Sequence, residues 1–234
     1  MAYGLFEKAG TIAPRCNFAR VVVNGEDLGI YTHVESVKKP MLRRHFEDDD
    51  GNLYEGQAAD FVDVSVDRIE LKTNEIENDR SDLVPLVNAL LVEDDALIEA
   101  LGEVIDLDSF LTFWAMEVMT GHWDSYSGGR NNYLTYHDPT SDRFHFIPWG
   151  TDGAFTQLRL FNPANTAVSV LAEGRIANRL YAHPEGRAMY LARLGELFEE
   201  VWHEEELASE AERIGALTEA PEELITTQRD FIFR

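Results

Sequence analysis

The sequence predicts an α+β fold, with a small β-rich part over residues 1–80 and a mainly helical part over residues 81–234. Before residue 80, β-branched residues alternate with other residues and lead into a strong hairpin-turn signal, which is typical of paired strands. After residue 80, apolar residues recur at three- and four-residue spacing, which is typical of amphipathic helices. One further hairpin is expected inside the helical part.

The β-rich part is expected to open with a hairpin, because Asn24-Gly25 readily takes the positive φ that a tight turn needs. The helix after it carries the one basic cluster of the chain, which consists of Lys38, Lys39, Arg43 and Arg44. The expected elements are two hairpin strands (residues 18–23 and 29–34), a helix (37–46) and further β structure (52–55 and 62–71).

The helical part is expected to contain one buried helix over residues 109–120, because this segment is apolar nearly all round. Asp108 or Ser109 is the expected N-cap, and Gly121 is the expected C-terminal stop. This helix leads from the core directly into a loop. The other expected elements are an antiparallel helix pair (83–91 and 96–105), a hairpin (132–136 and 143–148) and four helices within residues 168–233, broken near His183-Pro184 and Pro221.

The charge balance excludes some partners. The chain has 43 acidic and 20 basic residues and a formal net charge of -23. Such a surface repels a phosphate backbone, which argues against a nucleic-acid partner. Only 4 of the basic residues are Lys and 16 are Arg, a bias that is also typical of salt-adapted proteins. No stretch approaches the roughly 18 consecutive apolar residues of a membrane span, so no membrane insertion is expected.

Cys16 is the single cysteine, which excludes an internal disulfide and a multi-cysteine zinc site. It is predicted to be a small buried hydrophobic residue. The first residues lack the basic start and apolar run of a secretory signal. However, Met1 leads directly into sequence typical of the middle of a domain, which indicates a truncated or misassigned start.

The candidate chemistry lies in residues 122–155, where an acid and two amides precede the second hairpin and another acid follows it. Hard divalent cations prefer carboxylate and amide oxygens, and a nucleoside triphosphate needs such cations. Asp152, at the exit of the returning strand, is expected to ligate a metal and to lie near Asp124. Asn132 or Asn131 is expected to supply an amide ligand, and Asp124 to accept a proton from an attacking hydroxyl.

Less specific interpretations stay open for the same residues. Asp124 and Asp152 are also typical turn residues, and His122 is more typical of a structural residue than of a proton carrier. The basic cluster is also typical of an exposed helical face. Two other function classes use similar residues: a binding module of the same fold, which tolerates the loss of metal ligands, and a metal-dependent phosphohydrolase.

His122-Trp123-Asp124 is an H-x-D sequence like that of the protein-kinase catalytic loop, although the asparagines follow at seven and eight positions instead of five. The chain also resembles the CotH kinase-like family, the spore coat protein H family of atypical kinases. The resemblance covers roughly residues 18–158 and extends more loosely through the C-terminus. The matching segments are NGEDLGIYTHVESV, GNLYEG, WDSYSGGRNNYLTYHDP and FHFIPWGTDGAF.

This resemblance implies a two-lobed atypical protein-kinase fold that uses ATP and Mg or Mn to phosphorylate serine residues of a protein substrate. It assigns the catalytic aspartate to Asp124 and metal-binding positions to Asn132 and Asp152. It also implies nucleotide contacts by Glu35 and Lys39, which form an E-x-x-x-K arrangement. Asn131 is a further residue that we expect to bind the cofactor. Family members are often secreted or spore-associated, and the chain alone leaves its location and oligomeric state open.

One position departs from the family pattern. The first acid of the W-D-x-D element is Gly150 here, so one metal ligand is missing. Asp138 or Asp142 is expected to substitute for it in part, as a residue outside the inner ligand shell. The alternative function is therefore a catalytically impaired pseudokinase that acts as a protein-binding or surface and coat module.

Overall fold

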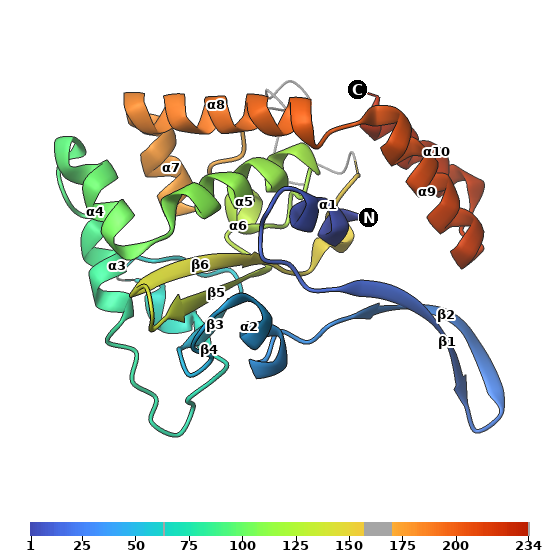
Figure 1. The fold of residues 1–234 in the computed structure, drawn as a ribbon, viewed down its shortest axis with the longest axis horizontal. Helices are drawn as coiled ribbons and strands as arrows, with labels where there is room; N and C mark the ends of the chain where they lie inside the picture. Colours follow the sequence, from blue (N-terminus) through green and yellow to red (C-terminus); the bar gives the residue numbers. More distant parts are fainter. Residues whose placement is uncertain (63, 157–169, 234) are drawn as a thin grey trace.

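The structure is a computed structural model that describes residues 1–62, 64–156 and 170–233. It contains both helices and strands, which confirms the predicted α+β class. Within the described residues, a four-stranded antiparallel sheet has the order β4-β3-β5-β6, and a separate hairpin consists of β1 and β2 (Figure 1). The strands are β1 (Cys16–Val23), β2 (Glu26–Val34), β3 (Leu53–Gly56), β4 (Glu70–Leu71), β5 (Tyr133–Asp138) and β6 (Arg143–Pro148).

Helices cover both faces of the sheet. The helices are α1 (Ala2–Lys8), α2 (Lys39–His45), α3 (Leu83–Ala89), α4 (Leu97–Val104), α5 (Leu107–Met119), α6 (Tyr126–Gly129), α7 (Arg175–Ala182), α8 (Pro184–Glu200), α9 (Glu204–Thr218) and α10 (Glu222–Ile232). The short 3-10 turns are η1 (Val66–Arg68), η2 (Asp94–Ala96) and η3 (Thr151–Gly153).

The pleat of the sheet explains this layering. Successive residues of a strand point to opposite faces. Phe144 and Phe146 of β6 pack in the main core with α5, whereas Ile147 packs in a smaller core with α2. The ring of Phe146 lies 4.9 Å from that of Phe110 of α5, centroid to centroid. Helix α5 therefore lies on one face of the sheet and α2 on the other (Figure 1).

Helix α5 is buried as predicted. Its Trp114 is inaccessible to solvent, and its ring stacks on Tyr190 of α8 at 3.8 Å. The predicted N-cap is wrong, however. Asp106 caps the helix by accepting a hydrogen bond from the Ser109 amide at 3.0 Å. The helix ends at Met119 with Thr120 as its C-cap, and Gly121 follows with a φ of +61°, a conformation that favours glycine.

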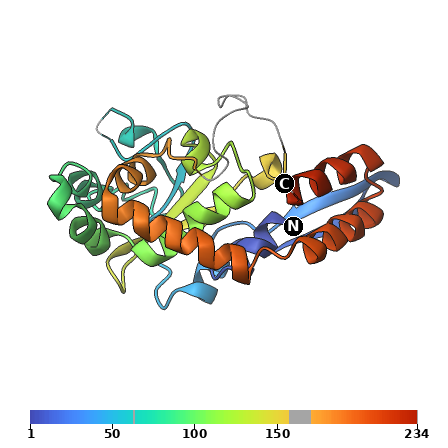
Figure 2. The same cartoon turned by 90° about the horizontal axis from the view of Figure 1, so that it is seen from above.

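The two predicted hairpins are confirmed. β1 pairs with β2 around Asn24-Gly25, whose positive φ values of 53° and 85° match a tight hairpin turn. This hairpin extends away from the sheet, at the end of the molecule that also carries α9 and α10 (Figures 1 and 2). β5 pairs with β6 with Tyr133 opposite Pro148 at one end and Asp138 opposite Arg143 at the other.

Three local predictions are wrong. Of the predicted β segment 62–71, the described residues form the turn η1 and a strand of only two residues, Glu70–Leu71. The segment predicted as a loop after Asp124 contains the short helix α6. Cys16 is exposed, because it is the first residue of a hairpin strand whose side chains are exposed or half-buried on both faces. Helix α1 is a further element that the sequence patterns do not indicate.

The remaining helices agree with the sequence. α3 and α4 lie within the predicted helix pair, and α7 to α10 occupy the C-terminal region with breaks at His183-Pro184 and before Pro221. Residues 157, 158, 168 and 169, which the predicted ranges included, lie outside the described residues. In the described ranges, no helix combines the length and apolarity needed to cross a membrane.

The sheet contains strands from both sides of residue 80. β3 and β4 precede this residue, and β3 pairs with β5 with Leu53 opposite Tyr136. Backbone hydrogen bonds therefore join the two parts of the chain that the sequence distinguishes. The division into parts of residues 1–80 and 81–234, and the two-lobed arrangement, stay predictions.

Candidate functional site

Asp124, Asn131 and Asn132 meet in one hydrogen-bonded group. The Nδ2 of Asn131 donates to Asp124 Oδ1 at 3.0 Å, and the Nδ2 of Asn132 donates to Asp124 Oδ2 at 2.8 Å. Asn132 Nδ2 also donates to the main-chain oxygen of Asp124 at 2.9 Å. Three of the predicted site residues are thus brought together, and two amides fix the position of the half-buried Asp124 carboxylate.

The two asparagine amides are oriented differently toward the rest of the site. Asn131 uses both ends of its amide, because its Oδ1 accepts a hydrogen bond from the Ala58 amide at 3.1 Å. Asn132 Oδ1 accepts no hydrogen bond from the residues that the structure describes. It faces Gly150, where an added Cβ would lie 2.6 Å from this oxygen. Asn132 Oδ1 is therefore the amide oxygen of the pair that is available to a ligand.

Residues in the left-handed backbone conformation gather at the same place. Arg130, Asn132 and Gly150 have φ values of 56°, 47° and 52°. This conformation is uncommon for residues other than glycine, although asparagine adopts it more readily than most. Unusual backbone conformations of this kind concentrate at functional sites, where the surrounding structure holds them in place.

The segment around Asp124 contacts the turn that carries Asp152. The Nε2 of His122 donates to the Trp149 carbonyl at 3.2 Å. The ring of Trp123 lies against Gly153, where an added Cβ would be 3.1 Å from its Nε1. Asp152 itself is exposed within η3. The two segments are therefore neighbours, and a metal shared by Asp124 and Asp152 stays a prediction.

His122 has the properties of a structural residue. It is fully buried, and burial lowers the pKa of its imidazole, while the carboxylates of Asp124 and Asp152 oppose this shift. Its Nε2 carries the proton that binds the Trp149 carbonyl, and its Nδ1 has no partner among the described residues. A neutral imidazole in this position orients the loop, which agrees with the structural interpretation of His122.

Glu117 is a site residue that the sequence analysis missed. It lies in α5, is fully buried, and accepts hydrogen bonds from the amides of Tyr126 at 3.2 Å and Ser127 at 2.9 Å. These amides belong to the first turn of α6, directly after Asp124. Burial raises the pKa of the Glu117 carboxyl to about 7, against the opposing hydrogen bonds from Ser127. An acid inside an otherwise apolar helix is the sequence signal for it.

Tyr126 anchors the other side of α6. Its hydroxyl donates to Asp60 Oδ1 at 3.3 Å and accepts from the Ile176 amide at 3.0 Å. Asp60 also accepts a hydrogen bond from the Arg175 amide at 2.8 Å, and burial raises the pKa of its carboxyl. The segment after Asp124 is thus held by buried polar contacts to α5 and to the start of α7.

Glu35 and Lys39 do not pair with each other. Glu35 binds the guanidinium groups of Arg44 at 2.7 Å and Arg15 at 3.0 Å, and Arg44 is the main cause that lowers the pKa of its carboxyl to about 2. Lys39 forms an ion pair with Asp50. No described contact links either residue to Asp124, so their role toward a nucleotide stays a prediction.

The expectation that Asp138 or Asp142 substitutes for the missing acid is wrong. Asp138 pairs across the hairpin with Arg143, at the end opposite Tyr133 and Pro148. The six residues of strand β5, or roughly 20 Å, separate Asp138 from Asn132. Asp138 accepts hydrogen bonds from the Thr140 and Ser141 amides in the hairpin turn, and Asp142 contacts His137 there. Both acids are turn residues.

The donor set fits a metal that a substrate helps to bind. Among the described residues, no group of three or more His, Cys, Asp and Glu side chains is arranged to hold an ion. Magnesium commonly binds through one or two carboxylates together with substrate phosphates, and it retains several waters. Asp152 and Asn132 supply donor atoms of the type that such a site uses, a carboxylate and an amide oxygen. They do not form a complete protein cage for a cation.

A cavity of about 510 Å³ borders the turn that carries Asp152. Its walls come from α1, the base of the β1–β2 hairpin, the segment after β6, and helices α9 and α10. The lining includes Cys16, Phe18, Val34, Trp149, Gly150, Asp152, Ile214 and Gln228. Cys16 and Asp152 therefore line one common cavity.

The comparison with known protein families agrees with these features. A sequence model described as "CotH kinase protein" matches residues 1–230. This chain belongs to the CotH family. The match includes both hairpins, the buried helix α5 and the Asp124 group, so the family extends over the elements that build the candidate site.

Three relatives of this CotH-family chain are similar at 25% to 27% identity. "Invasin CotH7" of Rhizopus delemar is 25% identical over 84% of the chain and 36% of its own length. "Inner spore coat protein H" of Bacillus subtilis is 26% identical over 66% of the chain and 45% of its own length. "Spore coat protein homolog 1" of Rhizopus delemar is 27% identical over 77% of the chain and 32% of its own length. The chain thus spans less than half the length of these curated relatives.

Proposed function

We propose that this CotH-family chain is an ATP-dependent atypical protein kinase that uses Mg or Mn and phosphorylates serine residues of a protein substrate. The observation that carries the proposal is the group in which Asn131 and Asn132 hold the Asp124 carboxylate at 3.0 Å and 2.8 Å. A positioned carboxylate next to an available amide oxygen supplies the proton acceptor and the metal ligand that phosphoryl transfer requires.

Asp124 is the proposed proton acceptor. The acceptor serine oxygen forms a bond to the γ-phosphorus, the bond from that phosphorus to the leaving ADP oxygen breaks, and the hydroxyl proton moves to Asp124. The two amides hold the carboxylate in place before the substrate arrives, which removes the cost of ordering it. His122 and Glu117 position the loop and take no part in the proton transfer.

Asn132 and Asp152 are the proposed metal-binding residues. These two side chains would hold the cation beside the Asp124 loop, where it would neutralise phosphate charge. The hydrogen bonds from Asn132 Nδ2 to Asp124 orient the amide so that its oxygen faces the turn after β6. Gly150 leaves the space in which this oxygen lies. We propose that the Asn132 amide thereby compensates in part for the absent first acid of the W-D-x-D element.

The nucleotide is proposed to bind in the cavity that Asp152 borders. Its base and sugar would contact the wall from the β1–β2 hairpin, with the phosphates toward Asp152. Glu35 and Lys39 follow this hairpin and are proposed to contact the nucleotide after local rearrangement of their ion pairs. Asn131 is proposed to support binding indirectly, since both ends of its amide already bind protein atoms.

The acceptor protein is proposed to be basic around its serine residues. The chain carries a net charge of -23, and such a surface accelerates the approach of a basic partner. Phosphorylation of a basic Ser-rich substrate would then slow as the ionic strength rises. A rate that is independent of salt would argue against this preference.

A pseudokinase is the alternative, and Gly150 is the observation that favours it. A CotH-like module without metal-dependent nucleotide binding would act as a protein-binding or surface and coat module.

Two relatives carry "spore coat" in their names, and on this basis we propose a spore-associated or surface location for this chain. Immunolabelling of spores and vegetative cells tests the location.

Thermal unfolding separates the two functions. The kinase proposal expects ATP with Mg or Mn to raise the melting temperature, because a ligand that binds only the folded state stabilises it. At a nucleotide concentration of about 100 Kd, the stabilisation is about 2.7 kcal/mol. ATP without the cation serves as the control. An unchanged melting temperature under all conditions supports the pseudokinase.

A further inference from the structure

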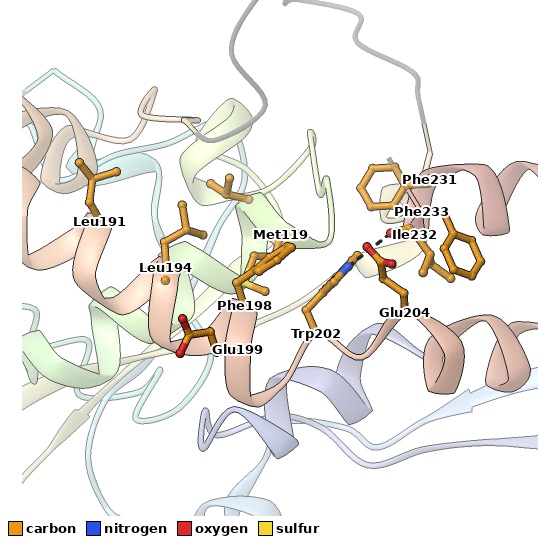
Figure 3. Close-up of a pocket in the computed structure, with 12 residues that line it drawn as sticks. Met119, Leu191, Leu194, Phe198, Glu199, Trp202, Glu204, Phe231, Ile232 and Phe233 are labelled. Atoms are coloured by element: carbon orange, nitrogen blue, oxygen red, sulfur yellow. Dashed lines mark hydrogen bonds between the residues drawn. The ribbon is translucent and has the colours of Figure 1, made fainter.

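An apolar groove lies between α5, α8 and α10, and the proposed kinase function does not use it. Its volume is about 600 Å³. Figure 3 shows Phe198 from α8 and Phe231 to Phe233 from the end of α10 on either side of Trp202. The remaining lining residues are Val118, Met119, Leu191, Leu194, Gly195, Glu199 and Glu204.

Aromatic residues that line the groove pack against Phe155 beneath it. The rings of Trp202 and Phe155 stack with centroids 6.2 Å apart, and Phe231 packs edge-on against Phe155 at 5.7 Å. Trp202 Nε1 also donates to the Ile232 carbonyl at 3.4 Å. Phe231 in turn lies against Gly121, where an added Cβ would be 2.6 Å from the ring. The groove therefore lies directly behind the loop that leads to Asp124.

The walls expose apolar side chains to solvent. Leu191, Phe198 and Phe233 are 46%, 56% and 45% exposed. Exposed apolar side chains that converge on one concave surface, with a polar edge, are typical of a binding site for another macromolecule. The groove is thus suited to one or two large apolar side chains of a partner.

The charge at the edge of the groove specifies the partner. Its two charged lining residues are both acidic, Glu199 and Glu204. Two nearby acids of α8 and α9 are neutralised, since Glu196 pairs with Arg193 and Glu206 with Lys8. Glu199 and Glu204 have no ion pair with any residue that the structure describes. Two unneutralised acids beside an apolar groove complement a cationic segment.

We propose that this groove binds a basic amphipathic helix of a partner protein, with apolar side chains in the groove and Lys or Arg beside Glu199 and Glu204. An apolar helix face in a hydrophobic groove is a common mode of peptide recognition. A second copy of the chain is a poorer occupant, because association would bring two acidic edges together. The proposal does not depend on kinase activity.

A synthetic peptide is the probe. It has Leu at helical three- and four-residue spacing on one face, Lys on the other, and a fluorescent label, and fluorescence anisotropy measures its binding to the full chain. A peptide with Glu in place of every Lys tests the charge. A peptide of the same composition in scrambled order tests the apolar face. We expect binding of the basic amphipathic peptide alone.

Gly195→Lys is the decisive variant, and Gly102→Lys is its matched control. Both glycines lie in helices, and an added Cβ meets nothing within 4 Å at either position. Both substitutions change the net charge equally and replace glycine by a better helix former. Only Gly195 lines the groove, so Gly195→Lys should weaken peptide binding roughly tenfold or more, or about 1.4 kcal/mol, and Gly102→Lys should not.

Equal binding by the two variants would overturn the proposal, as would equal binding of the acidic or scrambled peptide. Absence of peptide binding to the wild-type chain would do the same. Analytical ultracentrifugation adds one more outcome: a wild-type dimer that Gly195→Lys dissociates would assign the groove to a second copy. Labelled-ATP incorporation should be equal in both variants, so failure of the groove proposal and failure of the kinase proposal remain distinguishable.

Discussion

The side chain of Asn132 occupies the space beside Gly150 in which any larger residue would place its Cβ. That Cβ would lie 2.6 Å from both Cγ and Oδ1 of the asparagine, well inside van der Waals contact. The same amide donates to Asp124 at 2.8 Å. The absence of an acid at position 150 and the position of the Asn132 amide are therefore linked, because glycine at position 150 leaves room for the Asn132 side chain.

Gly150→Ala should destabilise the protein more than Gly10→Ala. Both glycines have positive φ, at 52° and 84°, but no atom lies within 4 Å of a Cβ on Gly10. Gly10→Ala measures the backbone strain alone. The collision with Asn132 should add about 1 to 3 kcal/mol to the loss of unfolding free energy in Gly150→Ala. Urea unfolding measures the loss of unfolding free energy in each variant. Equal losses in Gly150→Ala and Gly10→Ala would show that Asn132 moves aside at no free-energy cost.

Asp152→Ala should remove the metal dependence of nucleotide binding. The variant lacks the carboxylate of the proposed ligand pair, so isothermal titration with ATP and Mn should show at least a roughly tenfold weaker affinity. Asp142→Asn is the control, because it removes one carboxylate from the distant hairpin turn. Unaltered affinity in Asp152→Ala would mean that the metal lies elsewhere.

Glu117 should make stability depend on pH. Burial raises the pKa of its carboxyl from 4.5 to about 7 in the folded protein, so the folded state binds the proton more tightly. This contribution is fully present below pH 4.5 and is lost as the pH rises through 7. Relative to Glu117→Gln, the wild-type unfolding free energy should therefore fall by about 3 kcal/mol over this range. Parallel pH profiles for the two proteins would contradict the buried, titrating carboxyl.

Cys16 should report on the occupancy of the cavity. The chain has 1 cysteine and it is exposed, so iodoacetamide should label the folded protein at one site. Because Cys16 and Asp152 line the same cavity, ATP with Mn should slow this labelling in proportion to occupancy. Asp152→Ala should remove the protection. Labelling that is indifferent to the nucleotide in the wild-type protein would place the nucleotide outside this cavity.

Sequence patterns predicted the elements that depend on local rules. The Asn24-Gly25 turn and the apolar segment of α5 each carry a strong local signal, and the second hairpin followed from its turn formers. The convergence of Asp124 and Asn132 was also predictable, since one short segment joins them. The cap at Asp106 was missed because several acids near the start of α5 fit the same role.

Properties set by distant parts of the chain were not predictable. The E-x-x-x-K spacing suggested that Glu35 and Lys39 act together, but Arg15 and Arg44 bind the glutamate instead. Cys16 was expected in a core because of its residue type, and the hairpin that carries it extends away from the core. The hydrogen bonds that bind Glu117 to α6 arise only when the segment after Asp124 turns back onto α5.

Transfer of labelled phosphate from ATP tests whether Asp124 acts in phosphoryl transfer. The chain, Asp124→Asn and the control Asp142→Asn are incubated with ATP and Mn or Mg, and incorporation into the chain and into a generic Ser-rich peptide is measured. We expect incorporation by the wild type and by Asp142→Asn, and a fall of roughly 100-fold to 10,000-fold in Asp124→Asn without loss of folding. Equal incorporation by Asp124→Asn, or none by the wild type, would contradict this role of Asp124.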